Sequence, residues 1–311
     1  MGEHHTVLSA ADYRALTEAR VREPRSLRRA LAERRRRPLV GADGRMLLLA
    51  ADHTARGKLA IGSDPMAAVD RHSLLERILT GLADPRVDGV LGSADVLEEL
   101  ALLGALDGRL AVGTMNRGGI VGAHWELDDR LTAYDVEHVV STGLDGGKTL
   151  LRVEPTDPAV PRTLEMVAAI TTALADAGLM SLVEPLPYLK RPDGTVERDP
   201  SEDALTRMVA IASGLGSSSA STWLKIPATA DPARVAAATT CPVLLLGGDA
   251  GRDWPRVFDR WRTALEVPNV RGLVPGRVLL YPEELSVRDV VGRAGDLVHP
   301  SSTHPSMEVP A

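Results

Sequence analysis

The chain of 311 residues is 44% hydrophobic and 25% charged, with a formal net charge of −6, which is typical of a soluble globular protein. The negative charge and the lack of a long Lys/Arg tract beyond the N-terminal arm argue against a nucleic-acid or membrane surface. The single cysteine, Cys241, excludes an intramolecular disulfide and fits a reducing compartment. No apolar stretch reaches the length of a membrane span and no signal-peptide core is present, so we expect a cytoplasmic protein.

The N-terminal region has a helical, basic and polar pattern in which Pro24 separates two helices. We interpret the run Arg34-Arg35-Arg36-Arg37 as a cap on the negative end of the second helix rather than as a nucleic-acid site. The sequence thus predicts an N-terminal helical extension over residues 1–40, a barrel domain over 41–298 and a flexible tail over 299–311.

After Gly41, short apolar runs alternate with longer helical patterns, which is typical of repeated βα units. The predicted strands are Met46–Ala51, Val87–Leu91, Leu110–Gly113, Thr149–Val153, Leu179–Val183, Trp223–Ile226, Val243–Leu246 and Val270–Val274. Eight strands with intervening helices in about 230 residues predict an α/β fold, the (β/α)8 TIM barrel, which usually needs about 250. The polar insertion Arg191–Ser201 is interpreted as a mobile flap over the strand ends.

Lys225 lies in the short apolar strand Ser221–Pro227, where a buried cation is costly. Desolvation and a nearby positive charge lower the pKa of a buried lysine, so that its neutral amine can attack a carbonyl and form a Schiff base. The alternative is a lysine whose amine reaches from the end of the strand into solvent.

Active sites of TIM barrels lie at the carboxyl ends of the strands, so polar residues at these ends are candidates for catalysis and binding. The chain places these candidates there: Asp52, His53 and Arg56 after strand one, Lys148 and Arg152 on strand four, Glu184 after strand five, Lys225 on strand six, Gly247 and Gly248 after strand seven, and Gly276 and Arg277 after strand eight. Lys148 and Arg152 are an even number of residues apart and therefore share one face of their strand.

Five short motifs carry a resemblance to a known superfamily: Asp52-His53, Gly147-Lys148-Thr149-Leu150-Leu151, Leu182-Val183-Glu184, Leu224-Lys225-Ile226-Pro227 and Gly247-Gly248. In order and spacing they resemble the class I (Schiff-base) aldolases, which include the deoxyribose-phosphate, tagatose-bisphosphate and archaeal-type fructose-bisphosphate aldolases. The resemblance implies that Lys225 is the Schiff-base lysine and that acids belong at Asp52 and Glu184. The chain departs from the archaeal-type enzymes at Arg152, where they have a tyrosine that acts as acid and base.

The same chemistry can be inferred from the residues alone, without the resemblance to the aldolases. Repulsion between the ammonium groups of Lys148 and Lys225 in one cavity makes one amine nucleophilic. Asp52 and Glu184 are candidates for the proton transfers at the carbinolamine and at the β-hydroxyl. Structural roles stay open for each: a helix cap or a partner of Arg56 for Asp52, an orienting ion pair for Glu184, and a buried ion pair for Lys148.

The glycines after strands seven and eight, with Arg277, predict a phosphate site, although glycines also simply make tight turns. Arg152 is a good anion ligand and a poor proton donor, which favours a substrate with an additional carboxylate or phosphate. His53 is interpreted as a residue that orients its neighbours through hydrogen bonds.

We therefore expect a carbon–carbon lyase of carbohydrate metabolism that cleaves or forms a bond in a phosphorylated ketose or a keto-deoxy sugar (acid) phosphate. No cofactor or metal is expected, and assembly into a homo-oligomer is allowed by the sequence. The eight histidines lack the His-x-His and His-Glu-x-x-His spacings of divalent sites, which disfavours a metal-dependent lyase or isomerase. A non-catalytic barrel that binds a sugar phosphate is the other alternative.

Overall fold

The computed structural model of the protein describes residues 8–116, 119–248 and 254–300. The start of the predicted extension (1–7) and the predicted tail from 301 onward lie outside this range. The helices are α1 (Ala10–Arg22), α2 (Arg25–Glu33), the 3-10 turn η1 (Thr54–Arg56), α3 (Arg71–Leu82), α4 (Ala94–Leu102), α5 (Val136–Ser141), α6 (Val160–Asp176), α7 (Glu202–Ser213), α8 (Pro232–Ala236), α9 (Trp254–Ala264), α10 (Arg277–Leu280) and α11 (Val287–Val298). The strands are β1 (Met46–Ala50), β2 (Gly89–Gly92), β3 (Leu110–Thr114), β4 (Gly146–Val153), β5 (Met180–Lys190), β6 (Val196–Arg198), β7 (Thr222–Pro227), β8 (Val243–Leu246) and β9 (Val270–Leu273).

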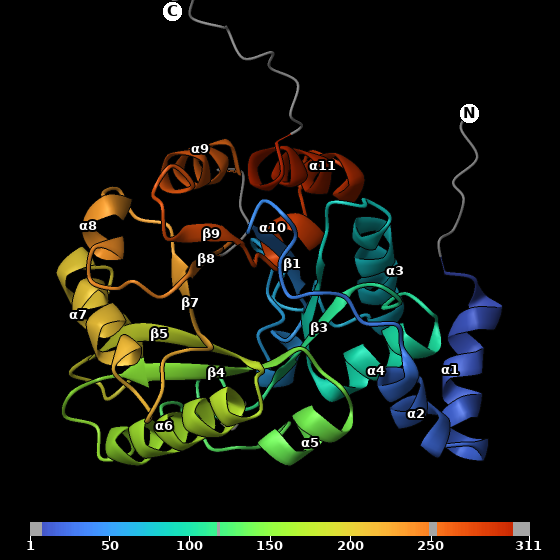
Figure 1. Ribbon diagram of the computed structural model, residues 1–311, viewed down its shortest axis with the longest axis horizontal. Coiled ribbons are helices and arrows are strands. Elements are labelled where there is room, and N and C mark those ends of the chain that lie inside the picture. The colour runs from blue at the N-terminus through green and yellow to red at the C-terminus, as the bar shows by residue number, and fades with distance from the viewer. Residues whose placement is uncertain (1–7, 117–118, 249–253, 301–311) are drawn as a thin grey trace, which may run out of the picture.

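Eight parallel strands close into a barrel in the order β1-β2-β3-β4-β5-β7-β8-β9, with β9 paired back to β1. Helices surround this barrel (Figure 1), which confirms the predicted (β/α)8 fold. Closure depends on Gly272, which has a φ of 149° and lies opposite Met46. A Cβ atom there would lie 1.9 Å from the carbonyl oxygen of Met46, so only glycine lets β9 approach β1.

The strands place alternate side chains on the two sides of the barrel wall. Leu48, Leu182 and Trp223 belong to the apolar layer inside the barrel, whereas Leu49 and Val183 pack toward the helices. The next inward positions toward the carboxyl ends of these strands are polar, because two residues further along stand Glu184 on β5 and Lys225 on β7. The apolar layer therefore forms the floor beneath the polar strand ends.

The arginine run after α2 connects the N-terminal helices to the base of the barrel. Arg34 donates to the carbonyl oxygen of Leu31 at 3.0 Å, as the predicted helix cap requires, and also to Asp145 at 2.6 Å. Arg37 donates to Asp88 at 2.6 Å. Asp145 and Asp88 immediately precede β4 and β2, so these contacts lie at the end of the barrel opposite the carboxyl ends of the strands.

The polar segment after strand five, interpreted as a mobile flap over the strand ends, forms a β-hairpin with the end of β5. β5 continues beyond the barrel to Lys190 and pairs antiparallel with β6, with Tyr188 opposite Arg198. The turn contains Gly194 at a φ of 84°, a conformation that glycine adopts without strain. The hairpin therefore brings residues of β5 and β6 to the mouth of the barrel.

The C-terminal helix is held at the base of the barrel by His299, which the sequence analysis placed at the start of the tail. Its Nδ1 lies 2.5 Å from Asp43 and its Nε2 lies 3.0 Å from Asp88.

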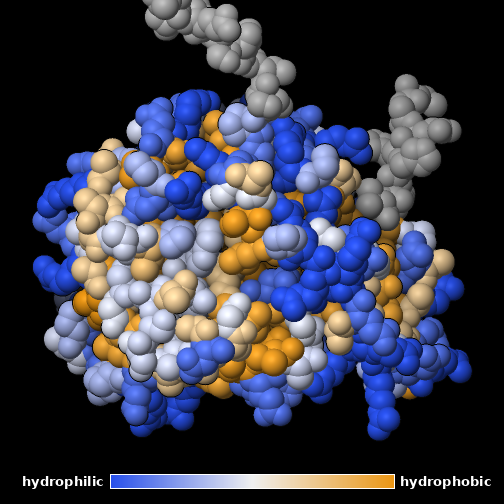
Figure 2. All heavy atoms as spheres, viewed as in Figure 1, coloured by the Kyte–Doolittle hydropathy of each residue, from blue (hydrophilic) through white to orange (hydrophobic). Residues whose placement is uncertain are grey.

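Hydrophilic residues cover most of the periphery of the molecule in Figure 2, while hydrophobic residues gather toward the middle of this face. None of the described helices combines the length and the apolar character needed to cross a membrane.

Candidate active site

A cavity of about 420 Å³ opens at the carboxyl ends of the barrel strands. All of the site residues predicted from the sequence line it except Lys148 and Arg152. Lys58, Tyr188 and Arg198 also line the cavity, although they were not among the residues expected from the sequence. The residues come from the ends of several strands and from the β5–β6 hairpin, so the cavity is assembled by the closure of the barrel.

Lys225 enters the cavity from the inward face of β7. Its neighbour on β8 is Leu244, and only 5% of the residue is exposed. Its Nζ lies 3.4 Å from Oε2 of Glu184 on β5. The amine therefore belongs to a side chain that lines the cavity beside a carboxylate and is largely shielded from solvent.

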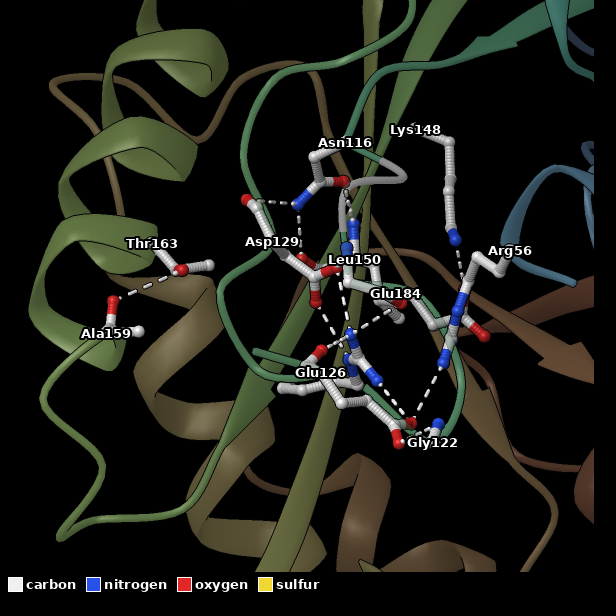
Figure 3. Close-up of polar contacts among 12 residues, drawn as sticks. Arg56, Asn116, Gly122, Glu126, Asp129, Lys148, Leu150, Ala159, Thr163 and Glu184 are labelled. Carbon is white, nitrogen blue, oxygen red and sulfur yellow. Dashed lines mark hydrogen bonds and ion pairs between the residues drawn. The ribbon is translucent and has the colours of Figure 1, made fainter. Parts of the chain in front are cut away.

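Lys148 lies behind the cavity wall and is fully buried. Its Nζ forms ion pairs with Oε2 of Glu184 and, at 3.5 Å, with Oδ2 of Asp52. Figure 3 shows the Lys148 side chain pointing toward Glu184. Both carboxylates line the cavity, so Lys148 holds them from the protein side while their other faces meet the space where a substrate would bind.

An ion pair with Arg56 was one of the open structural roles for Asp52, but the ion pairs seen for these two residues are with other side chains. Arg56 pairs with Glu126 at 3.4 Å (Figure 3), and Glu126 also accepts the backbone N–H of Gly122 at 2.8 Å. Asp52 pairs with Lys148. Arg56 thus ties the loop after β1 to the loop after β3 at the rim of the cavity.

Arg152 is fully buried and does not line the cavity. Its Nε donates to Asp129 at 2.8 Å and its Nη1 donates to Glu126 at 2.9 Å. These two acids, which Figure 3 shows on the loop after β3, neutralise the guanidinium. The interpretation of Arg152 as an anion ligand finds no support in this geometry, because the side chain holds the loop instead.

His53 lies next to several cations of the cavity. Burial, together with the charges of Arg277, Lys225 and Lys58, lowers the pKa of His53 to about 4. The ring is therefore neutral at neutral pH, chiefly because it is buried, and the nearby cations add to the effect. The interpretation of His53 as an orienting residue stays a prediction.

The glycines predicted to bind phosphate have mixed structural roles. Gly248 has a φ of 71°, which favours glycine, and among the described residues other than its chain neighbours no atom lies within 4 Å of the position of a Cβ there. A Cβ at Gly247 would lie 2.4 Å from Val278, so that glycine is also required by packing. Arg277 donates to the carbonyl oxygen of Ala60 at 3.1 Å, which brings its guanidinium to the loop after β1.

One signal in the sequence could have pointed to Lys58. The chain has 36 Lys and Arg residues, of which only four are lysines: Lys58, Lys148, Lys190 and Lys225. Two of these line the cavity and a third contacts its carboxylates. Three of the four lysines thus lie at the candidate site, although arginines line the cavity as well. No comparable signal marks Arg198, because it reaches the cavity only through the β5–β6 hairpin.

Comparison with known proteins places the chain among relatives of one family. The model of the Cgl0159-like family matches residues 44–295. The crystal structure of Cgl0159 from Corynebacterium glutamicum (Brevibacterium flavum) is 44% identical, covers 94% of this chain and 99% of that chain, and has a TM-score of 0.91. A comparison with curated proteins gave no match.

Archaeal fructose-1,6-bisphosphate aldolases share the fold. One structure, in which the catalytic lysine is covalently bound to the carbinolamine intermediate of the substrate, is 22% identical, with 88% of this chain and 99% of that chain covered and a TM-score of 0.63. Another is 20% identical, with 88% and 98% covered and a TM-score of 0.61. The resemblance to the class I aldolases is thereby confirmed at the level of the fold.

Proposed function

The chain belongs to the Cgl0159-like family, and we propose that it is a class I aldolase in which Lys225 forms a Schiff base with its substrate. One observation carries this proposal. The buried amine of Lys225 meets the carboxylate of Glu184 in a cavity at the carboxyl ends of the barrel strands. A barrel of the same fold, the archaeal aldolase, uses a lysine that becomes covalently bound to its substrate.

The proposed reaction begins when the neutral Nζ of Lys225 attacks the carbonyl carbon of the substrate. The carbonyl oxygen takes a proton to give a carbinolamine and then leaves as water, so that a protonated imine forms. Removal of the β-hydroxyl proton lets the electron pair of the bond between the α and β carbons move into the imine, which releases an aldehyde and leaves an enamine. Protonation of the enamine carbon and hydrolysis of the imine free the second product and the lysine.

Glu184 and Asp52 are the groups that we assign to the proton transfers. Glu184 is adjacent to the amine of Lys225, so it can give a proton to the oxygen of the carbinolamine and recover one from the amine. Asp52 lines the same cavity and is assigned to the β-hydroxyl. Lys148 is a positioning residue in this scheme, because it contacts both carboxylates but does not line the cavity.

The proposed substrate is a phosphorylated ketose or a keto-deoxy sugar (acid) phosphate of carbohydrate metabolism, processed in the cytoplasm without a cofactor. The cationic side chains that line the cavity support an anionic substrate. Arg152 does not support a sugar acid as the substrate, because its guanidinium is paired with Asp129 and Glu126. The division into extension, barrel and tail, and assembly into a homo-oligomer, likewise stay predictions.

Borohydride trapping tests the nucleophile. The protein is incubated with dihydroxyacetone phosphate or with unphosphorylated dihydroxyacetone, reduced, digested and analysed by mass spectrometry. We expect a stable adduct on the peptide that contains Lys225 and none in Lys225→Met, which removes the amine at similar volume. The matched control is Lys190→Met, because Lys190 is an exposed lysine of the hairpin. An adduct of wild-type yield in Lys225→Met would end the assignment.

Two alternatives make different predictions in the same assay. A non-catalytic barrel would bind a sugar phosphate without giving an adduct. A metal-dependent lyase would lose activity after prolonged treatment with EDTA and regain it with Zn²⁺, whereas imine formation survives EDTA because the imine itself is the electron sink. Among residues 8–116, 119–248 and 254–300, no group of three or more His, Cys, Asp or Glu side chains is arranged to hold a metal ion.

A further inference from the structure

Tyr188 contributes a phenol to the lining of the cavity, and the catalytic scheme above assigns no step to it. It follows Glu184 and Leu186 on β5, and all three side chains line the cavity because alternate residues of a strand share one face. Four residues of extended strand span about 13 Å, so Tyr188 lies well beyond Glu184 toward the carboxyl end of β5. Lys225 contacts Glu184 at 3.4 Å. The phenol is therefore displaced toward the mouth of the cavity relative to this amine.

The half-buried ring of Tyr188 is held by Arg152. The guanidinium carbon of Arg152 lies 5.5 Å from the centroid of the ring, within the range of a cation–π contact. This guanidinium is itself fixed by Asp129 and Glu126, and Arg152 does not line the cavity. Tyr188 thus contacts a buried, neutralised guanidinium and also lines the cavity, which gives its phenol a defined position at the mouth.

The phenol oxygen interacts with the same guanidinium. Burial lowers the pKa of Arg152, but the hydrogen bond and the charge of Asp129 outweigh burial, and a hydrogen bond to Tyr188 adds to them, so that the pKa lies above its usual value. A guanidinium can only donate, so the phenol oxygen is the acceptor of this bond. The phenol has in addition its own O–H to donate, and the hydroxyl oxygens of a sugar are suitable acceptors.

We propose that Tyr188 is a specificity-determining residue that donates a hydrogen bond to a hydroxyl group on the aldehyde half of the substrate. The inference rests on the proposed function, because cleavage through a Schiff base divides the substrate into a ketone half, which is bound to Lys225, and a half that leaves as an aldehyde. Along an extended sugar chain, the oxygens of the aldehyde half lie further from the imine than the bond that is cleaved. Tyr188 is displaced from the amine toward the mouth, so it suits a hydroxyaldehyde better than an alkyl aldehyde.

Two other roles for Tyr188 make different predictions. In proton transfer at the imine, the phenol would act at the amine of Lys225, where Glu184 already lies at 3.4 Å. Loss of the hydroxyl group would then slow imine formation itself. In a purely structural role, the ring would only pack against the guanidinium of Arg152. Tyr188→Phe keeps the ring and its cation–π contact, so in that case the substitution would not change the choice of substrate.

The test is aldol addition by the wild-type protein and by Tyr188→Phe. Each protein receives dihydroxyacetone phosphate as the ketone half and either D-glyceraldehyde or propanal as the aldehyde half, and the product is measured by mass spectrometry. The two aldehydes have the same carbon chain, but only glyceraldehyde carries hydroxyl groups. We expect Tyr188→Phe to lower kcat/KM for glyceraldehyde by about tenfold, because one hydrogen bond is lost, and to leave kcat/KM for propanal within about twofold of wild type.

Two controls accompany this comparison. Borohydride trapping with dihydroxyacetone phosphate alone needs only the ketone half, so the yield of the adduct on Lys225 should be the same in wild type and in Tyr188→Phe. Tyr13→Phe removes the same atom from a ring on α1, which packs against His72, and it should change the rate with neither aldehyde. An unchanged ratio of the two kcat/KM values in Tyr188→Phe would overturn the specificity role. A lower adduct yield in this variant would overturn the assignment to the aldehyde half.

Failure of the proposed function gives a different result from failure of this inference. If no Schiff base forms, the wild-type protein gives no adduct and adds neither aldehyde, which removes the division into two halves. If an adduct forms on Lys225 and Tyr188→Phe does not change the preference for glyceraldehyde, the Schiff base stands and only the role of Tyr188 falls. An adduct in wild type without addition to either aldehyde would overturn the aldolase reaction and the aldehyde half together.

Discussion

The Nζ atom of Lys225 lies 3.4 Å from Oε2 of Glu184, between adjacent strands of the barrel. The same oxygen contacts Nζ of Lys148 from the other side. Glu184 is thus shared between an amine that lines the cavity and one that does not. This sharing separates the roles of two lysines that look equivalent in the sequence: Lys225 can reach a substrate, whereas Lys148 can act only through the carboxylates that it holds.

Glu184→Gln should slow imine formation by about 100-fold or more. The substitution removes the group that we assign to proton transfer at the carbinolamine, which lies 3.4 Å from the amine of Lys225. The measurement is the rate of borohydride-trapped adduct formation with dihydroxyacetone phosphate. Glu197→Gln, at an exposed carboxylate of the hairpin, is the control. A rate within threefold of wild type, about 0.7 kcal/mol, would show that another group moves the proton.

Lys148→Met should destabilise the protein by about 3–5 kcal/mol, because it leaves the buried carboxylates of Asp52 and Glu184 without their shared cation. It should also move the pH at which imine formation is half-maximal to higher pH. A cation near Lys225 is lost and Glu184 is left to Lys225 alone, so the amine keeps its proton longer. Urea unfolding and the pH profile of trapping measure the two effects. Lys190→Met should change neither, and a lower half-maximal pH in Lys148→Met would contradict this role.

Arg152→Met should lower the free energy of unfolding by about 3–5 kcal/mol, because it removes the buried guanidinium from Asp129 and leaves Glu126 with Arg56 alone. The control is Arg191→Met, which breaks the exposed pair with Glu197 and should change the stability far less, because solvent screens that pair. The conservative Arg152→Lys keeps the charge and should retain most of the affinity for glycerol 3-phosphate. A tenfold loss of that affinity in a folded Arg152→Lys protein would restore Arg152 as an anion ligand.

His299 should stabilise the fold most at low pH. The hydrogen bond to Asp88, with a further one to Asp43, raises the pKa of His299 above its usual value of about 6.5. A raised pKa means that the protonated form is favoured in the folded state, so its contribution is complete below about pH 6.5 and is lost as the pH rises through the raised value. The difference in free energy of unfolding between wild type and His299→Asn should therefore be larger at pH 6 than at pH 9. An equal or larger difference at pH 9 would contradict the assignment.

The barrel and the strands that carry the candidate site could be predicted from the sequence. Eight apolar runs separated by helical patterns suffice to indicate a closed parallel barrel, because each run must be buried on both faces. Alternation along a strand also places Lys225 and Glu184 on the inward face. The observed β4 begins at Gly146 rather than at Thr149, but this difference at the strand end does not alter which residues point inward.

The alternation of side chains along a strand determines the face on which each one lies, but not which groups it contacts there. Lys148 and Arg152 share the inward face of β4, yet the acids that engage them come from β5, from the end of β1 and from the loop after β3. Asp129 and Glu126 have no regular spacing from Arg152 in the sequence, so its burial as a neutralised side chain could not be foreseen. An inward-pointing arginine can bind an anionic ligand only if no acidic side chain of the protein already pairs with its guanidinium.

The fold class, and the presence of a lysine and acids at the strand ends, could be read from the amino-acid sequence. Which cations reach the cavity depends on the folded chain, because Lys58, Arg198 and Arg277 all enter its lining only through barrel closure and the β5–β6 hairpin. The physical reason is the range of the forces involved. Hydrophobic periodicity is local and is written along each segment, whereas the electrostatic environment of an amine depends on charges that are distant in the chain and close in space.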